Sequence, residues 1–139
     1  MYRNLLVAMD GSEHSKRAAR EAINLVKEAP NAEVTIAYAI DYDKAEKEIS
    51  KGQTNEQVAA ARREFLAPLE ALFKEADVAF KTVVLHGAPG PAIVEHANEQ
   101  GYDAVVIGSR GLNPVQQFVL GSVSHKVAKR VKAPVLIVK

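Results

Sequence analysis

The stretch AVVIGSRGLNPVQQFVLGSVSHKV, residues 104–127, contains the strongest fold signal in the chain. It opens with a short apolar run without alternation of polar and apolar residues, which is typical of a strand covered on both faces. A loop with Gly108 and Gly111 follows, and Gly121 and Ser122 then lead into a predicted helix over residues 122–130. The stretch therefore predicts a strand, a glycine-rich loop and a helix, in that order.

The same alternation of strand and helix extends through the rest of the chain. Further helices are predicted to begin at Ser12, which acts as an N-cap, at Asn55 and at Pro89. The second of these contains Pro68 and is expected to remain one kinked element. The five runs rich in Val, Ile or Leu that predict strands are residues 4–9, 33–39, 79–85, 104–108 and 134–138. Strands alternating with helices indicate βαβ units and a largely parallel sheet.

We therefore predict an α/β fold: a single open parallel five-stranded sheet with helices on both faces, Rossmann-like, in one domain over residues 1–139. Two strand orders are compatible with this alternation, 3-2-1-4-5 and the flavodoxin-like 2-1-3-4-5. A receiver domain of the second type should offer an acid pair after strand one and a lysine after strand five. This chain has one acid there, Asp10, and almost no residues after its last strand, so we choose 3-2-1-4-5.

Composition excludes several classes of protein. The 139 residues are 47% apolar and 25% charged, as in ordinary globular domains, and the absence of cysteine excludes disulfides and thiolate metal sites. A net charge of +1 gives no overall basic field for nucleic acid, and no apolar run approaches the length of a membrane span. We expect a cytoplasmic protein with no nucleic-acid partner and no membrane association.

Residues 40–54, IDYDKAEKEISKGQT, form a polar insertion that is longer than a usual loop between strand and helix. An inert surface loop is the favoured interpretation, and a lid over a binding site is the alternative. The sequence leaves both open.

The glycine-rich loop and the helix after it have the properties of a phosphate site. Gly108 and Gly111 allow backbone amides to turn toward an anion, because they carry no side chain. Gly121, Ser122, Val123 and Ser124 would form a helix N-terminus with free amides and two hydroxyls. The helix dipole adds to the attraction for negative charge, so a triphosphate suits this site better than a neutral ligand.

Asp10 is a second candidate site residue, since it follows the first strand in a sharp turn. An Asx-turn or a helix-capping role would explain it without any ligand. In the order 3-2-1-4-5, however, the ligand crevice of an open sheet lies between strands one and four, so Asp10 would face Gly108. Arg110 and Lys126 could add charge-assisted contacts to an anion bound there.

These residues resemble the universal stress protein family, and its ATP-binding branch in particular. Gly108, Gly111, Gly121 and Ser122 match the family's ATP-binding signature GxxGx9G[S/T] without a gap. A first strand that ends in Asp10, the GxPxxxIxxxA pattern over residues 87–97 and the terminal APVLIV run agree with it. The resemblance extends over essentially the whole chain.

The resemblance implies a ligand, site residues and a partner. Ala8, Asp10 and Ala39 would surround the adenosine part of ATP, although the family's adenine pocket has proline and valine where this chain has alanines. The residues implied to hold ribose and phosphates are Gly108, Gly111, Gly121, Ser122, Val123 and Ser124, with Arg110 at a variable basic position. ATP would come with Mg²⁺ or Mn²⁺, whose ligands the sequence does not identify. A homodimer is also implied, and Val135 to Val138 would supply an apolar edge strand for it.

Three functions are compatible with these residues. The first is an ATP-dependent switch in a stress response that alters binding to a protein partner, which the sequence does not name. The second is a slow ATPase or phosphotransferase, for which a metal and a positioned nucleophile would be needed, and no catalytic residue is assigned. The third is an interaction module that works without ATP. Walker, GxGxxG, HExxH and GxSxG motifs are all missing from the sequence.

Overall fold

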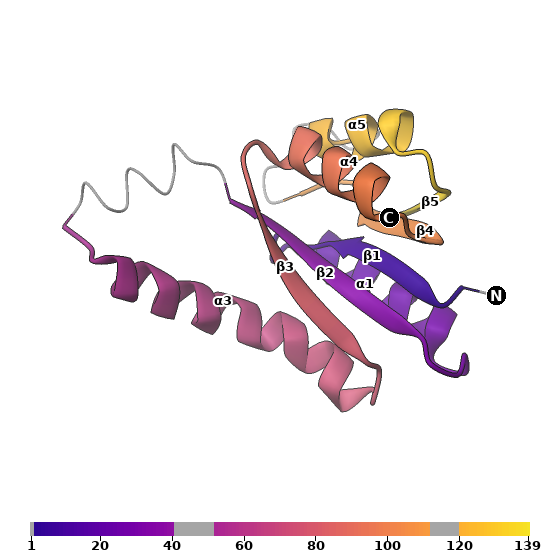
Figure 1. Cartoon of the computed structure of the whole chain (residues 1–139), viewed down its shortest axis with the longest axis horizontal. Coiled ribbons are helices and arrows are strands. Elements are labelled where there is room, and N and C mark those ends of the chain that lie inside the picture. Colours follow the sequence, from indigo (N-terminus) through magenta and orange to yellow (C-terminus); the bar gives the residue numbers. More distant parts are fainter. Residues whose placement is uncertain (1, 41–51, 112–119) are drawn as a thin grey trace.

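The computed structural model describes residues 2–40, 52–111 and 120–139 (Figure 1). Most of the polar insertion at 40–54 and the centre of the loop between Gly111 and Gly121 lie outside the described residues. The expectations for those two segments therefore stay predictions.

A five-stranded parallel sheet forms the centre of the molecule, in the order β3-β2-β1-β4-β5. This confirms the predicted fold class and strand order. Every strand end agrees with the predicted run to within one residue. The strands are β1 (Asn4–Ala8), β2 (Glu33–Ile40), β3 (Phe80–His86), β4 (Ala104–Gly108) and β5 (Val135–Val138). Because β1 pairs with both β2 and β4, the reversal of strand order falls between β1 and β4.

Among the described residues, two helices cover each face of the sheet (Figure 1). On one face lie α1 (Glu13–Val26) and α3 (Asn55–Glu75), and on the other lie α4 (Pro89–Gln100) and α5 (Ser122–Arg130). Alternate strand residues serve the two faces: Leu5 and Val7 of β1 pack toward α1 and α3, whereas Leu6 packs toward α4 and α5. The central strands are therefore apolar on both sides, which explains their unalternating sequence.

The helix ends follow local sequence signals. Ser12 caps α1 by accepting a hydrogen bond from the Ser15 amide at 3.1 Å. Thr54 and Gln57 form a reciprocal capping box at the start of α3, whose two bonds are 3.1 and 2.9 Å long. Pro68 lies inside α3, which runs as one helix from Asn55 to Glu75, as predicted.

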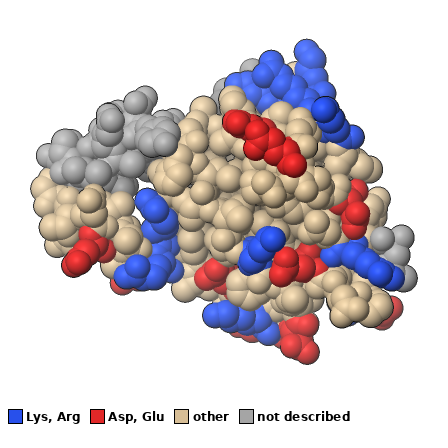
Figure 2. Space-filling view, in the orientation of Figure 1, with Lys and Arg blue, Asp and Glu red and all other residues tan. Residues whose placement is uncertain are grey.

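Charged side chains cover the outer surface unevenly. Figure 2 shows Lys and Arg gathered over α5, whose last turn carries Lys129 and Arg130, while acidic and basic side chains are interspersed on the rest of the face shown. Within the described part of the chain, no helix has both the length and the apolar character needed to cross a membrane.

Candidate functional site

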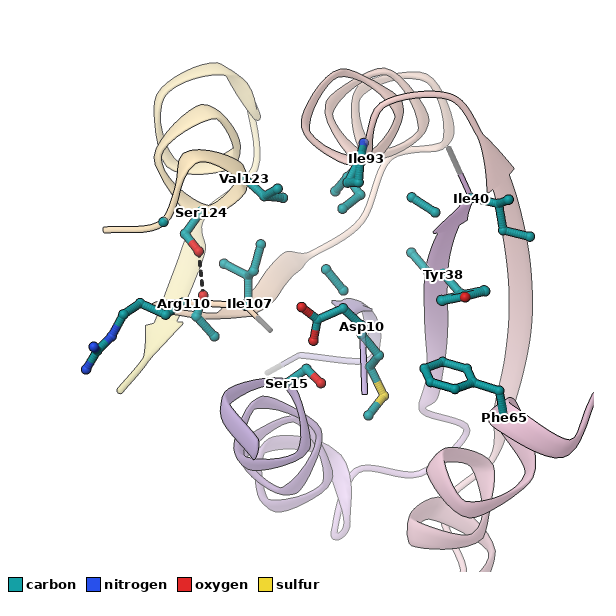
Figure 3. Close-up of a pocket in the computed structure, with 18 of the residues that line it drawn as sticks. Asp10, Ser15, Tyr38, Ile40, Phe65, Ile93, Ile107, Arg110, Val123 and Ser124 are labelled. Atoms are coloured by element: carbon teal, nitrogen blue, oxygen red, sulfur yellow. Dashed lines mark hydrogen bonds between the residues drawn. The ribbon is translucent and has the colours of Figure 1, made fainter. Parts of the chain in front are cut away.

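A cavity of about 590 Å³ lies at the carboxyl ends of β1, β2 and β4 (Figure 3). This is where open α/β sheets hold ligands, beside the reversal of strand order. Apart from Lys126, the site residues predicted from the sequence all line it: Ala8, Asp10, Ala39, Gly108, Arg110, Gly111, Gly121, Ser122, Val123 and Ser124. The tertiary structure therefore brings residues from four separate segments of the chain to one cavity.

The first turn of α5 provides the amides at one wall of this cavity. The amides of residues 122–124 have no partner within the helix, as at any helix N-terminus, and no side chain caps this end of α5. The amide of Gly121 is different, because it donates to the Ser109 carbonyl at 2.9 Å. Three successive amides and the positive end of the helix dipole are thus left at the wall for an anionic ligand.

The two hydroxyls of this turn have different roles. Ser124 is buried and its Oγ donates to the Gly108 carbonyl at 2.6 Å, which ties α5 to the end of β4 (Figure 3). Ser122 is exposed. The sequence suggests both hydroxyls as ligand groups, but the donor of Ser124 is already used by the fold, and only its lone pairs remain.

The three glycines of the loop differ in how much room the fold leaves for a side chain. A Cβ on Gly108 would lie 2.8 Å from the backbone carbon of His14, so α1 can pack against the end of β4 only without a side chain there. A Cβ on Gly111 would lie 2.6 Å from Oδ2 of Asp10. A Cβ on Gly121 would meet its nearest protein atom, Cα of Arg110, at an ordinary 3.5 Å. Packing of the described residues explains Gly108 and Gly111 but not Gly121.

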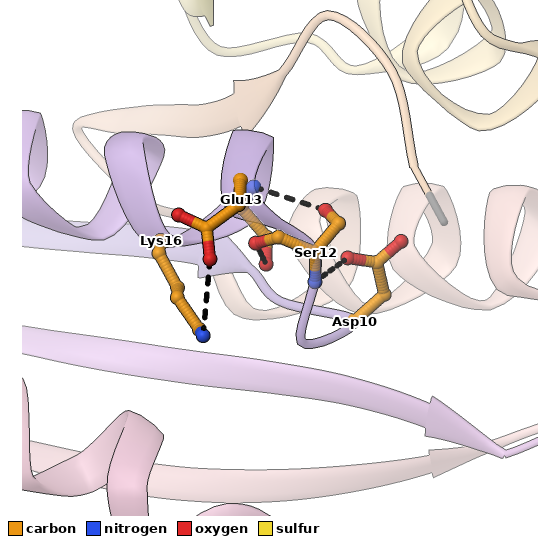
Figure 4. Close-up of polar contacts among 5 residues, drawn as sticks. Asp10, Ser12, Glu13 and Lys16 are labelled. Atoms are coloured by element: carbon orange, nitrogen blue, oxygen red, sulfur yellow. Dashed lines mark hydrogen bonds and ion pairs between the residues drawn. The ribbon is translucent and has the colours of Figure 1, made fainter. Parts of the chain in front are cut away.

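Asp10 makes the Asx turn that the sequence allowed, and it also lines the cavity. Its Oδ1 accepts a hydrogen bond from the Ser12 amide at 2.9 Å, which closes an Asx turn before α1 (Figure 4). The same carboxylate lies at the centre of the cavity in Figure 3. The turn therefore fixes the position of a negative charge that faces the cavity and the glycine-rich loop.

The two cations proposed for phosphate contact lie elsewhere. Figure 3 shows the Arg110 side chain leaving the cavity on the side away from Asp10. The stem of Lys126 lies against α4, since a Cβ on Gly90 would fall 2.8 Å from its Cδ, and Lys126 is not among the lining residues. Of the two, only Arg110 is among the residues that line the cavity.

Arg110 is instead close enough to α1 to affect His14 electrostatically. Burial and the positive charge of Arg17 lower the pKa of His14 from 6.5. Arg110 adds to this lowering, and the negative charge of Asp10 opposes it. Arg17 also donates from Nε to the Lys139 carbonyl at 3.0 Å, and this hydrogen bond links α1 to the residue that follows β5.

The opposite side of the cavity is largely apolar and includes a wall from α3 that the sequence does not reveal. Tyr38 and Ile40 from β2 and Ile93 from α4 line it, as Figure 3 shows. The missed wall consists of residues from the first half of α3: Val58, Ala61, Arg62 and Phe65. Their spacing of three and four residues marks one helix face, but such a face is ordinarily assigned to the core.

Charged groups are few within the cavity. Asp10, Arg62 and Arg110 are its charged lining residues in the described ranges. No cluster of three or more histidine, aspartate or glutamate side chains that could hold a metal occurs among the residues placed by the structure.

Comparison with known proteins relates the whole chain to one family. The model of the universal stress protein family matches residues 1–139. Universal stress protein YxiE of Bacillus subtilis is 33% identical, with all of both chains covered. The structure of hypothetical protein MJ0577 superposes with a TM-score of 0.82 at 27% identity, covering 100% of this chain and 96% of that one. A universal stress protein solved in complex with cAMP gives a TM-score of 0.67 at 31% identity, covering 99% and 97%.

Proposed function

The chain belongs to the universal stress protein family, and from this we propose that it binds an adenine nucleotide, with ATP as the first candidate, in the cavity beside β1 and β4. The observation that carries the proposal is the division of one cavity into two chemical halves. One half has the open N-terminus of α5, and the other is largely apolar and partly aromatic, with Arg62 as its charged residue among those described. A nucleotide has the same division, with an anionic end and a planar, largely apolar base.

The phosphates would lie at α5. The amides of residues 122–124 point their donors along the helix dipole, which favours anions there. Gly121 supports this placement, because the fold leaves room for a Cβ at that position and a ligand gives a reason for glycine. Any accompanying Mg²⁺ or Mn²⁺ would take its ligands mainly from phosphate oxygens and water, as is usual for Mg²⁺, since Asp10 is the only described carboxylate in the lining.

The base would lie on the apolar side, near Ala8, Ala39 and Tyr38. Apolar and aromatic lining with a few placed polar groups is typical of small-molecule sites, and a volume of about 590 Å³ falls within their usual range. The relative solved with cAMP supports an adenine nucleotide, because it is 31% identical to this chain over nearly its whole length.

We further propose that the nucleotide acts as a switch in a cytoplasmic stress response, changing how the protein binds a partner. Slow ATP hydrolysis or phosphoryl transfer is the second candidate, and the observation in its favour is the Asp10 carboxylate within the cavity. A module that works without ATP is the third.

A homodimer through β5 also belongs to this proposal. Both β3 and β5 are edge strands, but β3 carries the exposed Lys81, which discourages pairing with another strand. Residues 135–138 of β5 are all apolar, and Leu136 is 40% exposed. Pairing of two copies along β5 would satisfy the open edge and bury these side chains.

The experiment that tests nucleotide binding starts from freshly purified protein. The protein is denatured and the released small molecules are separated by chromatography, and the apo protein is then titrated with ATP, ADP, AMP and cAMP by calorimetry. We expect ATP in the released fraction and saturable, one-site ATP binding. ADP alone in the released fraction supports hydrolysis, and absence of both released nucleotide and measurable binding contradicts the proposal.

A further inference from the structure

The first half of α3 presents an aromatic ring to the cavity. Phe65 lines the cavity and is 38% exposed, which is unusual for a phenylalanine. It projects from α3 toward Tyr38 of β2, on the side of the cavity that faces Asp10 (Figure 3). The ring therefore belongs to the α3 wall of the cavity, which is separate from the walls formed by β1 and the glycine-rich loop.

Two other elements hold this ring in place. The rings of Phe65 and Tyr38 have centroids 5.1 Å apart and are tilted by 36°, within the range of favourable aromatic pairs. On another side the Phe65 ring lies against the turn after β1, since a Cβ on Gly11 would fall 2.7 Å from its Cζ. Gly11 has a φ of 87°, so the turn favours glycine on conformational grounds as well.

A ring held by two contacts and still open to a cavity is organised in advance for a ligand. Little side-chain freedom remains to be lost when a planar group packs against it, and this favours binding. The lining on this side also includes the apolar Ile40 and Val58 and the charged Arg62, so the preference for a base rests on the aromatic ring itself.

We propose that Phe65, supported by Tyr38, is the base-contacting residue of the nucleotide site and makes the site prefer purine over pyrimidine nucleotides. The proposal rests on the nucleotide-binding function proposed above. A purine has two fused rings and overlaps an aromatic side chain more fully than a pyrimidine does, so contact with Phe65 stabilises the purine more. The amides of α5 bind the phosphates of both classes equally and supply no such preference.

The test compares ATP, CTP and inorganic tripolyphosphate as probes, titrated into wild-type protein, Phe65→Ala and Phe65→Tyr. Wild type is expected to bind ATP more tightly than CTP. In Phe65→Ala the affinity for ATP should fall by about tenfold, the ATP-to-CTP ratio should approach one, and the affinity for tripolyphosphate should stay unchanged. Phe65→Tyr keeps the ring and should keep the preference.

Leu25→Ala is the matched control, because Leu25 is a 36% exposed apolar residue on α1 that does not line the cavity. Its ATP affinity should equal that of wild type. Nuclear Overhauser contacts between the Phe65 ring protons and adenine H2 or H8 in wild type give a second measurement that does not depend on how well Phe65→Ala folds.

The outcomes separate this proposal from the one on which it rests. Failure of wild type to bind any nucleotide overturns both. If wild type binds ATP and Phe65→Ala binds it with the same affinity, only the contact between Phe65 and the base is overturned. The same holds if Phe65→Ala loses affinity equally for ATP and for tripolyphosphate.

Discussion

Asp10 and Gly111 are in such close contact that a Cβ on Gly111 would lie 2.6 Å from Oδ2 of Asp10. The turn after β1 and the loop after β4 therefore meet through a carboxylate and a missing side chain. The position of each residue limits what the other can be.

Gly111→Ala is expected to displace the Asp10 carboxylate, because real Cβ atoms do not approach to 2.6 Å. It should lower ATP affinity and reduce the free energy of unfolding. In an Asp10→Ala background the clash is gone, so the same substitution should cost less, and a double-mutant cycle on thermal unfolding should give a coupling of about 1 kcal/mol. Additive effects of the two substitutions would show that the residues do not meet in solution.

Gly121→Asp tests the phosphate site at the start of α5. Gly121 has φ −60° and ψ 157°, which any residue adopts, and both Asp and Asn are favoured N-caps. The free energies of unfolding of Gly121→Asp and the isosteric Gly121→Asn should therefore lie within about 1 kcal/mol of the wild-type value. Only the aspartate places a negative charge beside the phosphates. The ATP affinity of Gly121→Asp, measured by calorimetry, should therefore be at least about tenfold lower than that of Gly121→Asn. Equal ATP affinities would count against phosphates at this helix end.

Ser124→Ala and Ser122→Ala form a matched pair. Ser124 Oγ donates to the Gly108 carbonyl in a buried position, so its loss leaves that carbonyl without this bond and should lower the free energy of unfolding by about 1–3 kcal/mol. Ser122 is exposed, and its substitution should leave thermal stability unchanged. Denaturant unfolding of both variants gives the comparison, and an undiminished stability of Ser124→Ala would contradict the structural role of its hydroxyl.

His96 makes stability depend on pH. Burial lowers the pKa of His96 from 6.5, the positive charge of Lys81 adds to this, and Glu99 opposes it. A lowered pKa means that the unfolded chain binds the proton more readily, so the stabilising contribution is complete above the unfolded pKa and is lost as pH falls through the folded pKa. As the pH is lowered below 6.5, the free energy of unfolding of the wild type should decrease. The decrease should be less steep in His96→Gln.

The hydroxyl of Tyr102 lies 2.8 Å from Nε2 of His96, and the neutral ring can accept a hydrogen bond from this hydroxyl. Proton NMR titration of His96 in the folded protein checks the direction of the shift. A folded pKa at or above 6.5 would reverse the predicted sign.

Leu136→Lys tests the proposed dimer. A lysine in the exposed position of β5 should discourage pairing of two edges, as charged residues do on natural edge strands. Light scattering coupled to gel filtration should give a dimer for wild type and a monomer for the variant. Leu25→Lys, at a 36% exposed position on α1, is the control and should remain dimeric. A monomeric wild type, or a dimeric Leu136→Lys variant, would remove β5 as the interface.

Sequence by itself determined the order of strands and helices and one wall of the cavity. Apolar runs, the Ser12 cap, the prolines of α4 and the spacing of Gly108, Gly111 and Gly121 are signals carried by neighbouring residues, so they can be recognised without a fold. The strand order needed one further step, from the single acid at Asp10, and the sheet confirms it.

Only the tertiary structure decided what faces the cavity from distant segments. Phe65 reads as a core residue in sequence, and its place beside Tyr38 and Gly11 depends on how α3 lies against the sheet. Arg110 turns away from the cavity and Ser124 donates to Gly108, although both have the spacing of ligand groups. The physical reason is that local spacing fixes where the backbone can turn, whereas the direction of a side chain is fixed by packing and hydrogen bonds with residues far along the chain.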